Sequence, residues 1–232
     1  MTKKKKSGSP VRTDHTDSAY MGIRRMLFHN EIAPGQKVSC RDLAKRLGMS
    51  PTPVIQALKR LESQGLIRHK PNRGYYTEPM NVQEVREIYE TREIIELSLL
   101  PETIKTLDEK GIQKLHDALQ ALLKAPKEIY LNERLLKDME FHLTLASLSG
   151  RKVQVQVLKF LFDLLYLKYR GALLFIHSER VVGSEHKNIF ESVASRDLVK
   201  AQRAVKQHFK NIKKPVLAAL EKILAEKEIS SF

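Results

Sequence analysis

The feature that most constrains this sequence is a helical periodicity that begins about a third of the way along the chain and continues to the C-terminus. Apolar residues recur there at intervals of three and four, with little strand character. Asn81 and Glu84 give a start signal for the first helix. The expected helices cover 81–107, 109–124, 128–148, 151–177, 184–195 and 198–226. Pro101 and Pro215 are expected to break or kink two of them. The pattern predicts an all-α helical bundle over residues 80–232.

The preceding third of the chain has short helical patterns separated by turn residues. The first expected helix starts near Ser18 and ends before the Ala33-Pro34-Gly35 turn. The second opens with Ser39 and Asp42 as a capping box and closes at Gly48. Two short helices in succession are typical of the start of a helix-turn-helix.

A third helix is expected after the turn Ser50-Pro51-Thr52-Pro53, where the serine can cap free N–H groups and the first proline lacks a donor at no cost. Its apolar residues follow helical spacing at Val54, Ala57, Leu58 and Leu61. Two strands, 66–68 and 75–77, flank the turn at 71–74. Three helices and a β-hairpin wing predict a winged helix-turn-helix over residues 18–79, so the whole chain is expected to be mainly α.

Basic charge is concentrated in the first third of the chain. Residues 1–79 carry a net +10, from 16 Lys and Arg against 6 Asp and Glu, out of the chain's total of +14. Residues 1–17 are polar and low in complexity, so we expect a disordered basic tail there. Local positive charge indicates phosphate binding, and the expected partner is a double-stranded DNA operator.

A helix-turn-helix reads DNA by placing its second helix in the major groove, which requires short polar or basic side chains opposite the buried stripe. The third expected helix has such a face, and a basic wing tip can reach phosphates or the minor groove. The candidate DNA-binding residues are Arg41, Ser50, Thr52, Ile55, Gln56, Lys59, Arg73 and Gly74. The alternative for each polar residue is that it only solvates an outer surface.

Four ionisable residues lie on apolar faces of three expected helices. Asp138 and His142 are four positions apart and share a face with apolar residues, and His186 and His208 also lie in apolar stripes. A buried carboxylate without a partner is costly. These side chains can satisfy one another around a divalent cation such as Zn, Mn, Ni or Co. A polar core without metal remains the alternative.

The segment from Ile32 to Tyr76, with its Ser-x-x-Pro-Val turn, resembles the winged-helix signature of the GntR family. It departs from the family where arginines are common, because this chain has Pro51 and Ile55. We hypothesise that Ile55 faces the groove and meets a thymine methyl group. The operator sequence therefore cannot be taken from the family.

Residues 81–226 resemble the FCD (FadR C-terminal) ligand-binding domain, whose metal-binding members have Asp-x-x-x-His on one helix and two later histidines. The segments KDMEFHLTLASLSG, SEHKNIFESVASRD and AQRAVKQHF carry this resemblance. It implies metal ligands at Asp138, His142, His186 and His208. Arg92 resembles a family arginine near the pocket and is a candidate for bidentate pairing with a carboxylate effector. The alternative for Arg92 is an exposed pair with Glu96.

Together these features predict a homodimeric transcriptional regulator, and the resemblance favours repression controlled by a small organic acid. A metal that prefers five or six ligands would leave positions for a carboxylate effector. A metal-responsive regulator and a purely structural metal are the alternatives. A metalloenzyme is disfavoured, because no inward general base accompanies the ligands. One cysteine and the absence of an apolar run of about 18 residues favour a cytoplasmic protein with no membrane partner.

Overall fold

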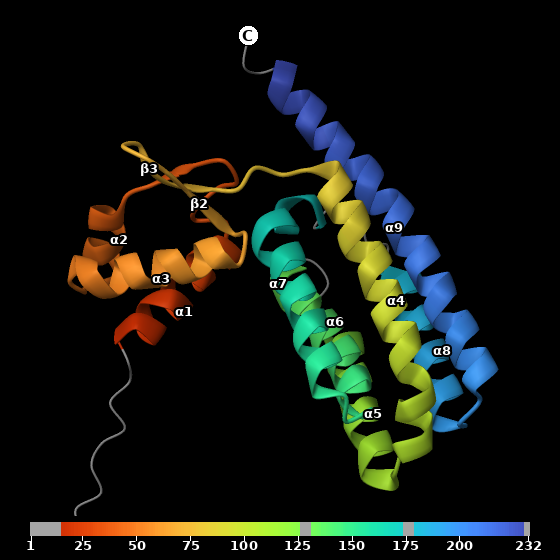
Figure 1. Cartoon of the computed structure of the whole chain (residues 1–232). Coiled ribbons are helices and arrows are strands. Elements are labelled where there is room, and N and C mark those ends of the chain that lie inside the picture. Colours follow the sequence, from red (N-terminus) through yellow and green to blue (C-terminus); the bar gives the residue numbers. More distant parts are fainter. Residues whose placement is uncertain (1–14, 126–130, 174–178, 230–232) are drawn as a thin grey trace, which may run out of the picture. The chain divides into compact units, whose positions relative to one another are not determined.

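The computed structural model describes residues 15–125, 131–173 and 179–229 (Figure 1). The chain divides into two compact units. One contains the residues up to Glu78 except Phe28–Asn30, and the other contains those three and the residues from Pro79 onward. The expected tail at 1–17 falls mostly outside the described residues.

The N-terminal unit contains three helices and a small sheet. Its elements are α1 (His15–Phe28), β1 (Lys37–Val38), α2 (Cys40–Leu47), α3 (Pro51–Ser63), β2 (Ile67–Lys70) and β3 (Gly74–Thr77). The antiparallel sheet has the order β1-β3-β2. The β2–β3 hairpin is the predicted wing, and β1 is an additional strand that the sequence did not predict. The unit is thus a winged helix-turn-helix.

Helix α1 begins at His15, three residues before the expected start near Ser18, so that prediction was wrong by nearly one turn. Contacts with α3 hold this first turn in place. Thr16 Oγ1 donates a hydrogen bond to Gln56 Oε1 at 2.6 Å, and Arg60 pairs with Asp17 at 2.8 Å. These partners are distant in sequence, which is why local patterns did not reveal the extra turn.

The caps of the helix-turn-helix follow the predicted chemistry in one helix and not in the next. In α2, Ser39 accepts a hydrogen bond from the Asp42 N–H, and Gly48 closes the helix with φ 65°. In α3, Ser50 is at the N-cap position but makes no capping hydrogen bond, contrary to expectation. Pro53, at the third helical position, has no N–H to donate, so one preferred partner of a capping serine is missing.

The C-terminal unit is a helical bundle. Its elements are α4 (Val82–Thr106), α5 (Glu109–Lys124), α6 (Leu131–Ser147), α7 (Lys152–Leu173), α8 (Glu179–Ala194) and α9 (Leu198–Ile229). Helix α4 packs against α6, α7, α8 and α9, and α9 also packs against α7 and α8. Helix α5 packs against α6 and α8 and buries Leu115, Leu119 and Leu122, so all six helices contribute to the core. Figure 1 shows the ribbons of this bundle.

The two helical prolines do not end their helices. Pro101 lies inside α4 and Pro215 inside α9. Burial continues beyond each proline, at Thr103 in α4 and at Val216 and Leu220 in α9. Packing on both sides compensates for the lost hydrogen bond. Within the described part of the chain, no helix combines the length and apolarity needed to cross a bilayer.

Candidate metal centre and nucleic-acid interface

Four predicted ligands meet in the core of the helical bundle. Asp138 and His142 come from α6, His186 from α8 and His208 from α9. One ligand atom from each residue lies within 4.8 Å of the other three, and all four side chains are buried. Ligands at about 2.0–2.2 Å from one ion would lie at most about 4.4 Å apart. A small inward adjustment therefore suffices for a single ion.

Local sequence explains why these polar groups point inward. The four-residue spacing of Asp138 and His142 places both on the α6 face that also buries Phe141 and Leu145. The ring centroid of Phe141 lies 5.0 Å from that of His186, in edge-on geometry. Apolar side chains of α6 thus pack beside the ligands in the core.

Two atoms of the cluster are buried and lack a hydrogen-bond partner. They are Asp138 Oδ1 and His208 Nε2. Asp138 Oδ1 lies 3.0 Å from His186 Nε2, at ion-pair distance but without hydrogen-bond geometry. His186 Nε2 in turn lies 3.2 Å from His142 Nε2. Unpaired buried polar atoms are costly, and a cation at the point where they converge would satisfy them. The donor set of three imidazoles and one carboxylate suits a divalent transition metal.

A second set of polar residues contacts three of the four ligands. Glu96 Oε2 lies 2.6 Å from His142 Nδ1, and Glu185 Oε2 lies 2.9 Å from His208 Nδ1. The Tyr166 hydroxyl donates to Asp138 Oδ2 at 2.7 Å. A carboxylate on Nδ1 leaves Nε2 free for a metal and increases the basicity of the ring. Sequence analysis missed the roles of Glu96, Tyr166 and Glu185, and only the position of Glu185 beside His186 offered a signal.

Arg92 pairs with Glu96, which was one of the two alternatives that the sequence left open. The pair is buried, although the sequence predicted an exposed one. Arg92 is 1% exposed and Glu96 is 4% exposed. The Arg92 Nε and Nη2 atoms donate to Glu96 Oε1 at 3.2 and 3.1 Å. The guanidinium carbon lies 3.8 Å from the ring centroid of Phe162. Arg92 therefore lies beside the cluster and already holds a carboxylate.

Electrostatics favours charged carboxylates and a neutral His208 at the cluster. Burial would raise the pKa of Glu96, but His142 and Arg92 lower it to about 2. Burial likewise opposes ionisation of Asp138, yet the surrounding imidazoles hold its pKa well below the ordinary value of 3.8. Burial lowers the pKa of His208 from 6.5 to about 4. These protonation states are the ones that bind metal.

The low pKa of His208 predicts how stability depends on pH. Between pH 6.5 and about 4 the unfolded chain binds a proton at this position that the folded chain does not. The contribution of His208 to the unfolding free energy is therefore fully present above pH 6.5 and is lost as the pH falls toward 4. We expect chelator-treated protein to show a lower unfolding free energy at pH 5 than at pH 7 in urea titrations. His208→Gln should flatten this dependence, and an unchanged slope in that variant would contradict the assignment.

Most candidate DNA-binding residues are exposed in the winged helix. Thr52, Ile55, Gln56 and Lys59 follow helical spacing on the α3 surface opposite the buried stripe. Ile55 is 38% exposed. Ser50 and Arg41 are exposed on the same helix-turn-helix, and Arg73 is exposed at the wing tip beside the half-exposed Gly74. Gln56 already accepts a hydrogen bond from Thr16, which a base contact would have to replace.

Comparison with known proteins gives matches over both units. Residues 15–76 match the model described as bacterial regulatory proteins of the gntR family, and residues 87–211 match the FCD domain. An uncharacterised HTH-type transcriptional regulator from an unstable DNA locus of Streptomyces ambofaciens is 30% identical over 207 residues, covering 87% of this chain and 84% of the relative. The HTH-type transcriptional repressor RspR of Escherichia coli is 25% identical over 201 residues, covering 85% and 86%.

Solved structures share the fold. A putative GntR transcriptional regulator from Rhodococcus sp. RHA1 superposes with a TM-score of 0.74 at 19% identity, covering 89% of this chain and 99% of that one. At this identity the likeness concerns the arrangement of helices and wing alone.

Proposed function

The chain belongs to the GntR family of bacterial regulatory proteins and has an FCD domain, and from this membership we propose that a small carboxylate bound at a metal centre controls its affinity for DNA. Members of this family are DNA-binding transcriptional regulators and not enzymes. We propose that the regulator forms a homodimer, holds a divalent ion in each chain, binds a carboxylate effector and represses transcription.

The observation that carries the proposal is the pair of orphaned atoms in the bundle core. Asp138 Oδ1 and His208 Nε2 are buried and have no hydrogen-bond partner. The carboxylates of Glu96 and Glu185 orient His142 and His208 so that each Nε2 faces the cluster. Asp138, His142, His186 and His208 would therefore hold a divalent ion such as Zn, Mn, Ni or Co.

The ion would supply open coordination positions that accept carboxylate oxygens. The chain's own contribution is to orient the four ligands and exclude water around them. Arg92 lies beside the cluster, and Glu96 balances its charge. We propose that Arg92 pairs directly with the carboxylate of the effector and that Glu96 gives up a hydrogen bond for this pairing.

On the DNA side, we propose that two winged helices of a homodimer bind a two-fold related operator, with Arg41, Ser50, Thr52, Ile55, Gln56, Lys59, Arg73 and Gly74 as the contacts. Effector binding would change the spacing of the two reading helices. The Escherichia coli relative RspR is named a transcriptional repressor, which supports repression as the outcome here.

A DNA-release experiment tests the proposed control. Operator duplexes are first selected by the metal-loaded protein from a random library and then titrated, by fluorescence anisotropy, with a panel of mono-, di- and tricarboxylates. We expect one class of carboxylate to weaken operator binding in the wild type and to have no effect on an Asp138→Ala, His142→Ala variant. Equal responses in both proteins would contradict a metal-anchored effector. A response to the metal alone would favour the metal-responsive alternative.

A substitution on α3 tests the DNA-reading surface. We expect Ile55→Ala to weaken operator binding by roughly fivefold, on the order of 1 kcal/mol, and to relax the preference for thymine at one position, because the side chain loses its contact with a methyl group. Since Ile55 is 38% exposed, the fold should be unaffected. Ile94→Ala, which changes an exposed isoleucine of α4, is the matched control. Unaltered affinity and base preference in Ile55→Ala would exclude this contact.

A further inference from the structure

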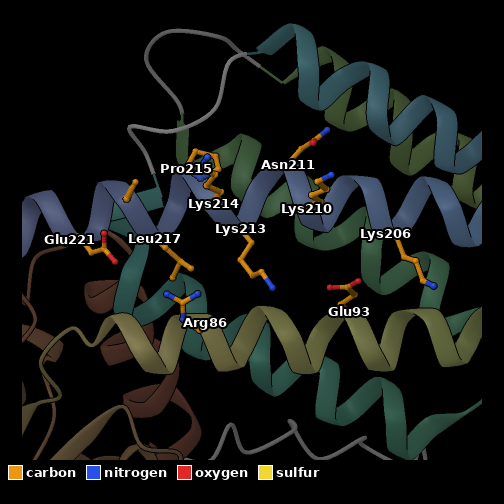
Figure 2. Close-up of a pocket in the computed structure, with 11 residues that line it drawn as sticks. Arg86, Glu93, Lys206, Lys210, Asn211, Lys213, Lys214, Pro215, Leu217 and Glu221 are labelled. Atoms are coloured by element: carbon orange, nitrogen blue, oxygen red, sulfur yellow. The ribbon is translucent and has the colours of Figure 1, made fainter.

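A second candidate ligand site lies in a groove between α4 and α9. The groove has a volume of about 740 Å³, within the range of small-molecule sites. Its cationic lining residues are Arg86, Lys206, Lys210, Lys213 and Lys214. Figure 2 shows Lys213 and Lys206 extending from α9 toward α4, where Arg86 and Glu93 lie.

The groove carries an excess of positive charge that the protein does not neutralise. Glu93 and Glu221 are its acidic lining residues, so five cations and two carboxylates line the groove. Lys213 pairs with Glu90 at 3.4 Å. The other four cations of the lining are Arg86, Lys206, Lys210 and Lys214. Within the described part of the chain, none of them makes an ion pair or a side-chain hydrogen bond. The groove thus offers several free donors to an anion.

The spacing along α9 makes this arrangement unfavourable for the protein alone. Lys206 and Lys210 are four residues apart, as are Lys210 and Lys214. Like charges at this separation share a helix face and destabilise it. A multivalent anion would relieve the repulsion, and lysine ammonium groups bind phosphate well as point charges.

The groove is distinct from the metal centre, because none of the four cluster residues lines it. The two sites are nevertheless neighbours. Asn211 lines the groove, and its Nδ2 donates to Glu185 Oε1 at 2.5 Å, while the other oxygen of Glu185 lies 2.9 Å from His208 Nδ1. A molecule bound in the groove would therefore contact Asn211, and the hydrogen-bond partner of Asn211, Glu185, also contacts the proposed metal ligand His208.

We propose that the α4–α9 groove binds a small molecule that carries a diphosphate or triphosphate group. The net charge of the lining residues matches two or three negative charges, and the volume leaves room for more than the phosphates alone. The site is separate from the proposed carboxylate site, so either proposal can fail without the other.

Calorimetric titration of the full chain with inorganic tripolyphosphate tests this proposal. We expect saturable binding of the wild type and an increase in Kd of about tenfold or more in Lys210→Gln, Lys214→Gln. The control is Lys200→Gln, Lys222→Gln, which removes the same charge from α9 outside the groove and should leave Kd unchanged. Equal weakening in both pairs would indicate non-specific attraction and overturn the proposal.

A substitution of opposite sign provides a second test. Glu93→Gln removes a carboxylate that repels the anion, so it should tighten tripolyphosphate binding severalfold. Glu140→Gln makes the same charge change on α6, outside the groove, and should have little effect.

The metal-centre variant tests the location of the site. Tripolyphosphate binding that persists in Asp138→Ala, His142→Ala supports the groove, whereas its loss there would assign the phosphate to the metal centre.

Nucleic acid is the competing occupant. If Lys210→Gln, Lys214→Gln weakens binding of an unrelated DNA duplex as strongly as it weakens tripolyphosphate binding, the groove contacts a DNA backbone and the small-ligand proposal is wrong. Unchanged duplex affinity together with the loss of tripolyphosphate binding supports it.

Discussion

Purified protein is expected to contain about one divalent ion per chain, and the Asp138→Ala, His142→Ala variant is expected to contain none. The physical reason is the convergence of four buried ligand atoms, two of which have no hydrogen-bond partner in the protein. Elemental analysis of protein prepared without a metal-affinity tag measures the stoichiometry directly. The variant removes one oxygen and one nitrogen ligand, which leaves too few donors for tight binding.

Removal of the metal should also lower thermal stability. At a free metal concentration of about 1,000 times Kd, binding stabilises the folded state by about 4 kcal/mol. For a chain of this size, that corresponds to a Tm shift on the order of 10 °C on chelation. Calorimetric scans with and without EDTA measure it, and the double variant should show no chelator effect. If both proteins remain metal-free after reconstitution, the four residues form a polar core and the effector binds elsewhere.

The second large effect is expected from Glu96→Gln. Glu96 neutralises the buried Arg92 and also holds His142 Nδ1. Loss of its charge leaves an uncompensated buried guanidinium, which should cost about 3–5 kcal/mol of unfolding free energy. Metal affinity should fall by about 10- to 100-fold, because His142 loses the carboxylate that orients it. Urea unfolding and competitive metal titration measure the two effects.

Two further variants separate these roles. Glu87→Gln makes the same change at an exposed position on α4 and should alter neither quantity measurably. Arg92→Met combined with Glu96→Gln removes the buried positive charge, so it should recover part of the lost stability while metal affinity stays low. A stable single variant with wild-type metal affinity would show that Glu96 has neither role.

Much of the helical architecture followed from local patterns, because helix periodicity and turn residues act over a few positions. The helices of the bundle and of the winged unit were expected near their observed positions, except that α8 begins at Glu179, five residues before the expected start at 184. Two other differences occur where contacts distant in sequence act. Helix α1 gains a turn through Asp17 and Arg60, and α9 continues through Pro215 because Val216 and Leu220 remain packed.

Sequence alone predicted that Asp138, His142, His186 and His208 point into the bundle, because their spacing relative to apolar neighbours defines the buried face of each helix. Packing between helices brings these faces together at one point, and it also buries Arg92 and places Glu96 beside His142, which local patterns did not reveal. Periodicity fixes the direction of a side chain relative to its own helix axis. It does not specify which helix lies opposite, and that choice depends on packing across the whole core.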